Sequence, residues 1–570
     1  MRRLLPAVLC AALALGLPAA ARAGSLTVKP VPDSPVQVAL SNGRLPGRTL
    51  SARRALAIAS ALSKVRDARR GHPGTYGAVY TKGPVRWQVS YFSKGGRREL
   101  AQVIIEDRSG RVLEAWSGFQ VAWTMARGYR GAFGEHVNAL YIWLPMCLLF
   151  MLPFVNFRRL LSLLHLDLLV LLSFSVSLAF FNHAHIYASV PLAFPPLLYL
   201  LGRMLWMLRR RAAGARPPEP LRLLIPAPWL AVAVVFLIGF RVGLNVTDSN
   251  VIDVGYAGVI GAQRITHDRP LYGGFPADNE HGDTYGPFNY EAYVPFEKAF
   301  GWSGRWDDLP AAHGAAIFFD LLTVGLLFLL GRRMRGPTLG IALAYAWVSY
   351  PFTLFALESN ANDTLVAAMV LAALLAAGYA SGLARFARGG FAALAALTKV
   401  APLALAPILA TDGLRELPWR ARLRSLALFA AGFLVLGALA AVPALRHDSL
   451  HTIYERTLVY QANRDSPFSV WGLYGWHGAE LAAELFAAGL ALVLAVIPRR
   501  SDLVGLAAGC AAIMLAIELS MEHWFYLYIP WFFGLTIVAL LGRFSPLPAQ
   551  AGDAASEPAR STPRAAALST

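Results

Sequence analysis

Long apolar runs alternate with short polar gaps over most of this chain. A helix needs about 20 mostly apolar residues to cross the hydrocarbon core of a bilayer. The run lengths therefore predict a mainly α fold, a polytopic transmembrane helical bundle of about 11 spans. We place the spans near residues 138–156, 160–181, 186–208, 227–246, 312–331, 338–356, 364–381, 424–444, 479–497, 502–519 and 523–541.

One further apolar stretch, Phe391 to Ala410, is predicted not to cross the membrane. Pro402 disfavours a continuous helix through its middle. A full crossing would also place the basic segment Arg415–Arg424 on the outer side, against the positive-inside pattern of the other arginine clusters. We therefore expect two short half-helices or a re-entrant segment whose broken backbone is shielded from lipid.

The chain ahead of the first span has a different pattern. Residues 1–23 combine a basic start, a short apolar run and a small-x-small end, which predicts a signal peptide. An uncleaved first anchor is the alternative, and either way the next segment is exported. In that segment, residues 24–135, apolar positions at helical spacing predict a helix over Ser51–Arg70. Alternating positions predict three strand-like runs at Tyr76–Thr81, Val85–Phe92 and Leu100–Ile105, the last of which continues through a turn at 107–110 into Arg111–Ala115.

This order of one helix and several strands, with Trp87-Gln88-Val89 and a late Asp-x-x-Gly turn, resembles the PepSY domain, a small exported α+β module. The resemblance implies a binding or regulatory accessory without chemistry of its own.

Composition agrees with a membrane protein, since 56% of the residues are hydrophobic and 15% are charged. The net charge of +18 falls in arginine clusters between apolar runs, which orients the chain and argues against nucleic acid as a partner. The tail, residues 542–570, is rich in Ala, Pro and Ser and is expected to be disordered and cytoplasmic. With this topology the outer face gathers the polar segments Val246–Ala311, Leu357–Asp363, Arg446–Gly478 and Ser520–His523.

Asp253 is the candidate base. It lies a few residues beyond an apolar helix, and a carboxylate so close to hydrocarbon is costly and therefore often functional. Such a group can accept the proton of an incoming hydroxyl as a new bond forms. The alternative is an N-cap for the segment Tyr256–Ile260.

Cationic candidates lie in the same outer segments or in the broken one. Lys399 is a lysine within an apolar run, where it must either meet an anion or extend its ammonium to the interface. Arg456 and Arg464, beside hydroxyls and Gln461, suit recognition of phosphate and sugar. The alternatives are ion pairs of these arginines with Glu455 and Asp465. His523 is a further cation candidate, and its neighbour Trp524 is expected in the aromatic belt at the interface.

Asn360 and Asn362 precede a predicted span. Capping of the helix that begins at Thr364 is the simpler interpretation, and a hydrogen bond to substrate is the alternative. His183-Ala184-His185 and Glu280-His281-Gly282-Asp283 offer too few ligands to predict a metal site. No phosphate-binding Gly-x-x-x-x-Gly-Lys motif is present, and we expect no metal and no cofactor.

Several short motifs follow one another in a recognisable order. They are Asp253-x-x-Tyr256, Pro270-Leu271-Tyr272, Tyr285-x-Pro287-Phe288, Asn360-x-Asn362, Lys399-x-x-Pro402 and His523-x-x-Tyr526. On this topology, the region from about Pro228 to Gly542 resembles the GT-C superfamily of membrane glycosyltransferases. Within it, the chain is most similar to the bacterial family that uses donors of the polyprenyl-phosphate-mannose type.

The resemblance implies a catalytic domain over 227–541, with accessory helices over 138–226. It implies inverting transfer of a mannose-like hexose from a polyprenyl-phosphate donor to a glycan or lipid acceptor of the cell envelope. Asp253 would be the base, and Lys399, Arg456, Arg464 or His523 would neutralise the departing phosphate. Tyr256, Tyr285, Asn360, Asn362 and Gln461 would contact substrate. Phosphate is a good leaving group, so no general acid is needed.

The expected location is the cell membrane, with several spans and with the N-terminal domain and the active site extracytoplasmic. Two other classes remain open. A membrane transporter would carry polar residues along a path through the bilayer. A peptide-sensing or assembly protein would use its spans only as anchors.

Overall fold

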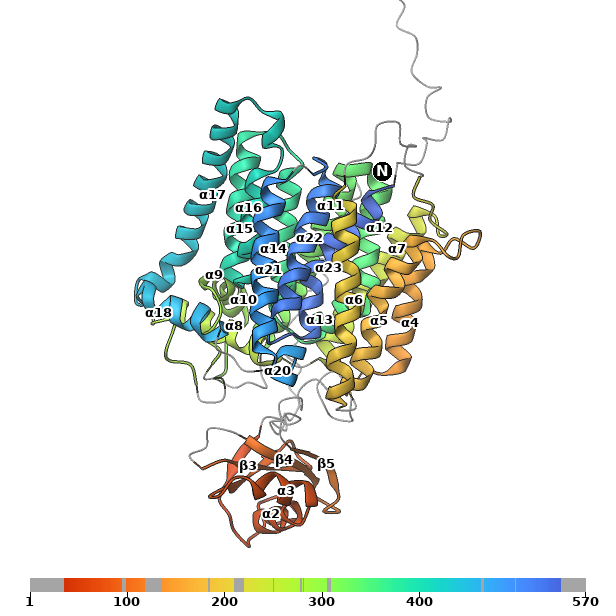
Figure 1. Cartoon of the computed structure of the whole chain (residues 1–570). Helices are drawn as coiled ribbons and strands as arrows, with labels where there is room; N and C mark the ends of the chain where they lie inside the picture. The colour runs from red at the N-terminus through yellow and green to blue at the C-terminus, as the bar shows by residue number, and fades with distance from the viewer. Residues whose placement is uncertain are drawn as a thin grey trace, which may run out of the picture. The chain divides into compact units, whose positions relative to one another are not determined.

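The computed structural model describes residues 35–94, 99–117, 136–182, 185–209, 220–249, 251–276, 279, 281–304, 309–462, 466–497 and 499–544. The chain divides into two compact units, Met1–Trp116 and Ser117–Thr570 (Figure 1). The predicted signal peptide and the predicted tail beyond residue 544 lie outside the described residues, as do Arg464, Asp465 and His183.

The N-terminal unit is a five-stranded sheet with two helices. The strands β1 (Val36–Val38), β2 (Tyr76–Lys82), β3 (Arg86–Phe92), β4 (Glu99–Glu106) and β5 (Val112–Ser117) lie in chain order, and β1 to β4 pair antiparallel. The helices α2 (Ala52–Ser60) and α3 (Ser63–Arg70) contact β2, β3 and β4. Their small and branched residues pack with inward strand residues such as Trp87, Val89 and Val103.

The strands β2, β3 and β4 match the three predicted runs, and β5 matches the predicted continuation after the turn, but two details differ. The predicted helix Ser51–Arg70 is two helices interrupted at Ala61 and Leu62. The edge strand β1 was not predicted, because its three residues, two exposed and one half-buried, carry no clear alternation. The likeness to a PepSY domain stays a prediction.

Asp107 joins the turn after β4 to the rest of this unit. Its buried carboxylate accepts hydrogen bonds from the indole Nε1 of Trp87 (2.6 Å) and from the backbone N–H groups of Thr49 (2.8 Å) and Leu50 (3.1 Å). Burial raises the pKa of Asp107, but these hydrogen bonds together outweigh it and hold the pKa below its ordinary value.

The second unit is helical. Its longer helices are α4 (Leu140–Met151), α5 (Leu163–Asn182), α6 (Ile186–Met207), α7 (Ala227–Asp248), α8 (Asp253–Thr266), α11 (Pro310–Arg335), α12 (Pro337–Ser349), α13 (Pro351–Glu358), α14 (Asp363–Ala377), α15 (Gly382–Thr398), α17 (Trp419–Leu445), α21 (His477–Val496), α22 (Leu503–Ser520) and α23 (Ile529–Gly542). Short helical segments lie between them: η2 (Leu152–Phe154), α9 (Pro287–Glu291), α10 (Val294–Phe300), η4 (Ala401–Leu405), α16 (Ala406–Thr411), η5 (Leu414–Glu416), α18 (Leu450–Tyr454), the π-helix η6 (Glu455–Val459), α19 (Tyr460–Ala462), α20 (Val470–Tyr474) and η7 (Tyr526–Tyr528).

Each predicted span coincides with a helix or with a bent pair of helices. Within the described residues, seven helices are long and apolar enough to cross a membrane, or up to eight if the bent pair α12 and α13 is one span. Three other predicted spans, at α4, α14 and α23, are shorter apolar helices. The count of eleven therefore stays a prediction. Over the span predicted at 338–356 the helix is not continuous, because the chain bends by 59° where Pro351 begins α13.

Among the seven long helices α22 is the best buried, and it lies beside α23 and α14 in the middle of the bundle (Figure 1). Its sequence is rich in Ala and Gly, and small residues let helix backbones approach closely. In contrast, α7, α17 and α21 present mostly exposed apolar side chains, and α17 lies at one edge of the bundle in Figure 1. Such surfaces suit contact with lipid.

The apolar stretch 391–410 is broken, as predicted. Helix α15 ends at Thr398, Lys399 has extended backbone (φ −142°, ψ 149°), and η4 and α16 follow. Arg388 in α15 forms an ion pair of 3.7 Å with Asp412, directly after α16. The chain therefore doubles back between these two residues. Re-entrance into a membrane stays a prediction, because only the break and the reversal are seen.

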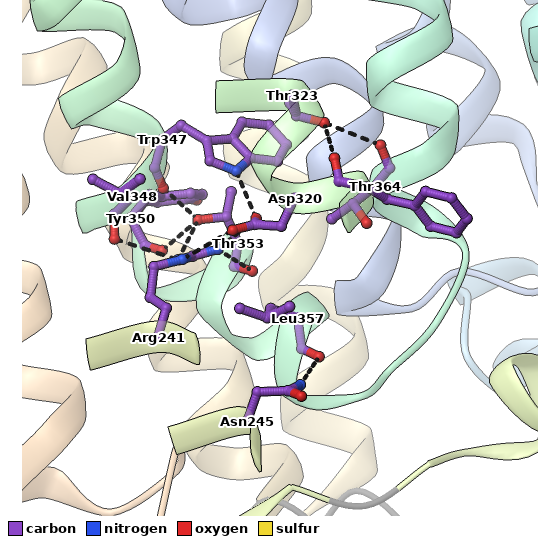
Figure 2. A network of polar contacts seen from close by, with 11 residues as sticks. Arg241, Asn245, Asp320, Thr323, Trp347, Val348, Tyr350, Thr353, Leu357 and Thr364 are labelled. Atoms are coloured by element: carbon purple, nitrogen blue, oxygen red, sulfur yellow. Dashed lines mark hydrogen bonds and ion pairs between the residues drawn. The ribbon is translucent and has the colours of Figure 1, made fainter. Parts of the chain in front are cut away.

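An ion pair inside the bundle joins α7 to α11. Arg241 is fully buried and donates from Nη2 to Asp320 Oδ1 over 2.6 Å (Figure 2). It also donates to the backbone carbonyls of Val348 (3.3 Å) and Thr353 (3.1 Å), on either side of the bend between α12 and α13. The indole of Trp347 donates to the same Asp320 oxygen over 2.8 Å. The network thus fixes the bend against two neighbouring helices.

Candidate functional site

Asp253 begins α8. Ile252 occupies the N-cap position, so the interpretation of Asp253 as an N-cap was wrong. A carboxylate in the first turn is favoured by the positive end of the helix dipole. The side chain is half-buried, and the backbone carbonyl of Asp253 accepts a hydrogen bond from Asn279 Nδ2 over 2.9 Å.

The loop between α13 and α14 lies directly against the start of α8. A Cβ at Gly255 would collide with the carbonyl oxygen of Asn360, so only glycine allows this approach. The backbone N–H of Ile252 donates to Ser359 O over 3.2 Å. Asn360 itself has a positive φ of 51° and accepts a hydrogen bond from Asn245 Nδ2 at 2.9 Å. These contacts tie Asp253 to the loop, and they give Asn360 a structural role.

Asn362 also differs from the simple capping interpretation. It does occupy the N-cap position of α14, but its side chain makes no capping hydrogen bond. Instead Asn362 Nδ2 donates to Asn289 Oδ1 over 2.6 Å, which connects this loop to α9.

Lys399 meets an anion. Its Nζ lies 2.6 Å from Asp363 Oδ1, and this oxygen also accepts from Trp531 Nε1 over 2.9 Å. The sequence left open whether the ammonium of Lys399 meets an anion or extends to the interface, and in the structure it meets an anion. Asp363 was not predicted as a site residue, and its place at the start of a helix gave only a capping signal.

Tyr285 reaches the same lysine. Its ring centroid lies 5.6 Å from Lys399 Nζ. The next residue, Gly286, packs so closely on Leu397 that an added Cβ would collide with the carbonyl of Leu397. The absence of a side chain at Gly286 therefore lets the loop before α9 approach the end of α15.

Arg456 pairs with a different residue than expected. Its Nη1 lies 3.4 Å from Oδ2 of the fully buried Asp283, and not beside Glu455 as the alternative proposed. Asp283 Oδ2 also accepts from the backbone N–H of Gly273 over 2.6 Å. Arg456 lies in the π-helix η6, and such helices are frequent at functional sites. Because Asp283 and Tyr285 are two residues apart, Arg456 and Lys399 contact neighbouring parts of one segment.

His523 joins this region through aromatic contacts. Its Nδ1 is 2.8 Å from Ser466 Oγ, and its ring lies 6.3 Å from that of Tyr528. Tyr528 in turn lies 5.1 Å from Lys399 Nζ. Trp524 is buried and donates to Glu518 over 3.0 Å, so its expected place in an interfacial aromatic belt was wrong.

Two other predicted substrate residues have different surroundings. Tyr256 is buried, with its ring edge-on to Trp302 at 5.7 Å. Gln461 is exposed, next to Tyr460, whose ring lies 5.2 Å from that of His281. Their roles stay predictions, and Arg464 lies outside the described residues.

Sequence reasoning also missed a set of buried polar atoms around Asp363, the partner of Lys399. Within the described chain, these atoms have no hydrogen-bond partner: Asp363 Oδ2, Asn289 Nδ2, Asn362 Oδ1 and Tyr293 Oη. Buried polar groups are nearly always paired, so such a set calls for an explanation such as bound water or ligand. No cluster of three or more His, Cys, Asp or Glu side chains placed to hold a metal occurs in the part of the chain that the structure describes.

Comparison with known proteins finds a family model that matches the central part of the chain. Residues 284–520 match the model of Glycosyltransferase family 87. The matched segment is somewhat less than half of the 570 residues, and it contains Tyr285, Asp363, Lys399 and Arg456 but not Asp253 or His523. With the helical bundle described above, the family 87 match supports a membrane glycosyltransferase.

One solved structure with some likeness is the crystal structure of ArnT from Cupriavidus metallidurans bound to undecaprenyl phosphate. It is 18% identical, the match covers 56% of this chain and 60% of that chain, and the TM-score is 0.37. This chain thus matches less than two thirds of that protein, and the similarity is too low to support an inference. The comparison with curated proteins gives no match.

Proposed function

We propose that this protein is an integral-membrane glycosyltransferase that moves a mannose-like hexose from a polyprenyl-phosphate donor to an acceptor of the cell envelope at the outer face. The match of residues 284–520 to Glycosyltransferase family 87 carries the proposal. The contacts that link Lys399, Arg456 and the start of α8 through the segment 279–286 support a single site.

In the proposed reaction Asp253 accepts the proton of the acceptor hydroxyl. The hydroxyl oxygen then bonds to the anomeric carbon of the donor sugar, on the face opposite the phosphate. The bond from that carbon to the phosphate oxygen breaks, so the configuration inverts and polyprenyl phosphate leaves. Lys399, Arg456 and His523 would stabilise the negative charge that develops on the phosphate, which is usually a large term in such reactions. Arg464 keeps the same proposed role.

The test is transfer by the purified full chain reconstituted into sealed lipid vesicles. The protein is incubated with polyprenyl-phosphate hexoses that carry a radiolabelled sugar, together with a cell-envelope extract, and labelled products are separated by chromatography. We expect the wild type to label an envelope component and Asp253→Asn to lose at least about 10²-fold in rate.

Asp248→Asn is the matched control. Asp248 ends α7 five residues earlier, and its carboxylate pairs with His136 at 3.2 Å. This variant should keep transfer. If the wild type moves label across the membrane without attaching it to an acceptor, a transporter replaces our proposal. Full transfer by Asp253→Asn would remove Asp253 as the base.

A further inference from the structure

Asp363 forms an ion pair with Lys399, and its own side chain is only 1% exposed. It begins α14, so its negative charge lies at the positive end of that helix. Its Oδ1 accepts from Lys399 Nζ (2.6 Å) and from Trp531 Nε1 (2.9 Å).

Three aromatic rings surround the same ammonium group. Lys399 Nζ lies 4.9 Å from the ring centroid of Trp531, 5.1 Å from that of Tyr528 and 5.6 Å from that of Tyr285. Such distances give favourable cation–π contacts. The rings come from α23, from η7 and from the loop before α9, while Lys399 itself lies in the extended break after α15. The ammonium is therefore placed by its neighbours as well as by its own backbone.

A purely structural ion pair would be a poor explanation for this arrangement. Replacing a buried ion pair with apolar residues is often neutral or stabilising, so stability alone gives little reason for one. Asp363 Oδ2 is buried without a hydrogen-bond partner among the described residues, and so are nearby amide atoms of Asn289 and Asn362. A set of polar groups that is only partly satisfied costs free energy, whereas a bound ligand or water would complete it.

We propose that Asp363 is a positioning residue: it holds the Lys399 ammonium charged and in place for the phosphate of the donor. This inference rests on the proposed function, because the donor phosphate is the anion concerned. A carboxylate close to a lysine favours the charged ammonium, and Lys has three N–H donors, of which Asp363 takes one. Trp531 positions Asp363 in turn through its indole N–H.

The first experiment measures the place of Lys399 without relying on activity. The chain has six lysines, so an amine-reactive ester followed by peptide mass spectrometry reports each one separately. Lys399 should react slowly in the wild type, because its side chain is only 10% exposed and ion-paired. Asp363→Asn should raise the labelling rate of Lys399 several-fold, while that of the exposed Lys298 in α10 stays unchanged. Polyprenyl phosphate should protect Lys399 in the wild type and protect it less in the variant.

The second experiment measures transfer. Asp363→Asn should lower kcat/KM for the donor by about 10- to 100-fold, as expected when a reacting group is displaced by up to about 1 Å. The loss should appear mainly in the donor KM, with the acceptor KM unchanged, and Asp363→Glu should recover part of it. Lys399 labelling that does not change in Asp363→Asn overturns the proposal, and so does an unchanged donor KM.

Two further variants keep the test decisive. Asp412→Asn removes the charge of another buried carboxylate, which forms an ion pair with Arg499 at 3.0 Å. This variant should leave the labelling rate of Lys399 unchanged even if the protein is less stable. If Asp363→Asn does not fold, Trp531→Phe keeps a ring beside Lys399 but removes the hydrogen bond to Asp363, and should give a smaller effect of the same kind. Protection by polyprenyl phosphate without any transfer would overturn the proposed function and support this inference.

Discussion

The ion pair between Arg241 and Asp320 gives a prediction whose size follows from the structure. Arg241→Met keeps the length and most of the volume of the side chain but removes its charge. Asp320, which is 3% exposed, would remain as a buried carboxylate without a charged partner in this network. Trp347 Nε1 would still donate to it.

Two effects contribute to the expected loss of stability. Hydrogen bonds between helices in a membrane are worth roughly 0.6 to 2 kcal/mol each. Removing one partner of a buried ion pair costs about 3–5 kcal/mol, because the other charge stays buried alone. We expect the lone charge to dominate, so Arg241→Met should lose about 3–5 kcal/mol of unfolding free energy.

The double variant Arg241→Met/Asp320→Asn separates the two effects. It loses every hydrogen bond of Arg241 but leaves no buried charge, and the asparagine carbonyl can still accept from Trp347. It should therefore recover most of the stability lost in the single variant. The measurement is unfolding by sodium dodecyl sulfate in mixed micelles, followed by intrinsic fluorescence. A double variant as unstable as the single one would refute the reasoning, because the lost hydrogen bonds would then explain the whole effect.

Four further predictions concern the site, the topology and the N-terminal unit. Lys399→Ala should lower donor kcat/KM about 10²–10³-fold in the transfer assay, and unchanged donor dependence would return Lys399 to a structural role. Gly286→Ala should lower both thermal stability and transfer, because its Cβ would meet Leu397 O, whereas Gly325→Ala, with open space around it, should be neutral or stabilising. Arg420→Cys should react with a membrane-impermeant thiol reagent only from the cytoplasmic side in oriented vesicles, and labelling from outside would contradict a re-entrant segment. Folding lowers the pKa of Asp107, so the carboxylate stabilises the folded N-terminal unit fully above the ordinary value of 3.8 and loses this effect as the pH falls through the folded value. Pepsin should therefore cleave the N-terminal unit faster as the pH drops below 3.8. The variant Asp107→Asn should show less of this pH dependence.

Much of the fold could be predicted because its signals are local. Runs of apolar residues predicted every helix in the predicted spans, and period-two alternation predicted β2, β3 and β4, with β5 as a continuation of the last run. Pro402 marked the broken stretch, although the break itself falls at Lys399. The bend at Pro351 carried the same kind of signal, but the apolar run there continues on both sides of the proline and concealed it.

The partners within the site could not be predicted, because they come from distant parts of the chain. Lys399 was recognisable as a charge that needs an anion, but nothing in the sequence selects Asp363, 36 residues earlier, over other carboxylates. Arg456 has an acidic neighbour in Glu455, yet it pairs with Asp283. Proximity in the sequence favoured a pair of Arg456 with Glu455. The observed pair with Asp283 forms because the loop before α9 packs on the segment after α17.

The residues that depart from local rules lie together in this fold. Lys399 is a charge within an apolar run, Asn360 has a positive φ, and Gly286 permits a backbone contact that any side chain would block. Local rules are usually broken where function requires it, and the cost is met by stabilising contacts elsewhere. Here the contacts come from rigid neighbours: Asn360 is held by Asn245 of α7, one turn beyond Arg241, and Lys399 is held by Asp363 at the start of α14. The buried network of Figure 2 and the loop beside Asp253 are therefore held by the same helix, α7, and a loss of stability at Arg241 should also loosen that loop.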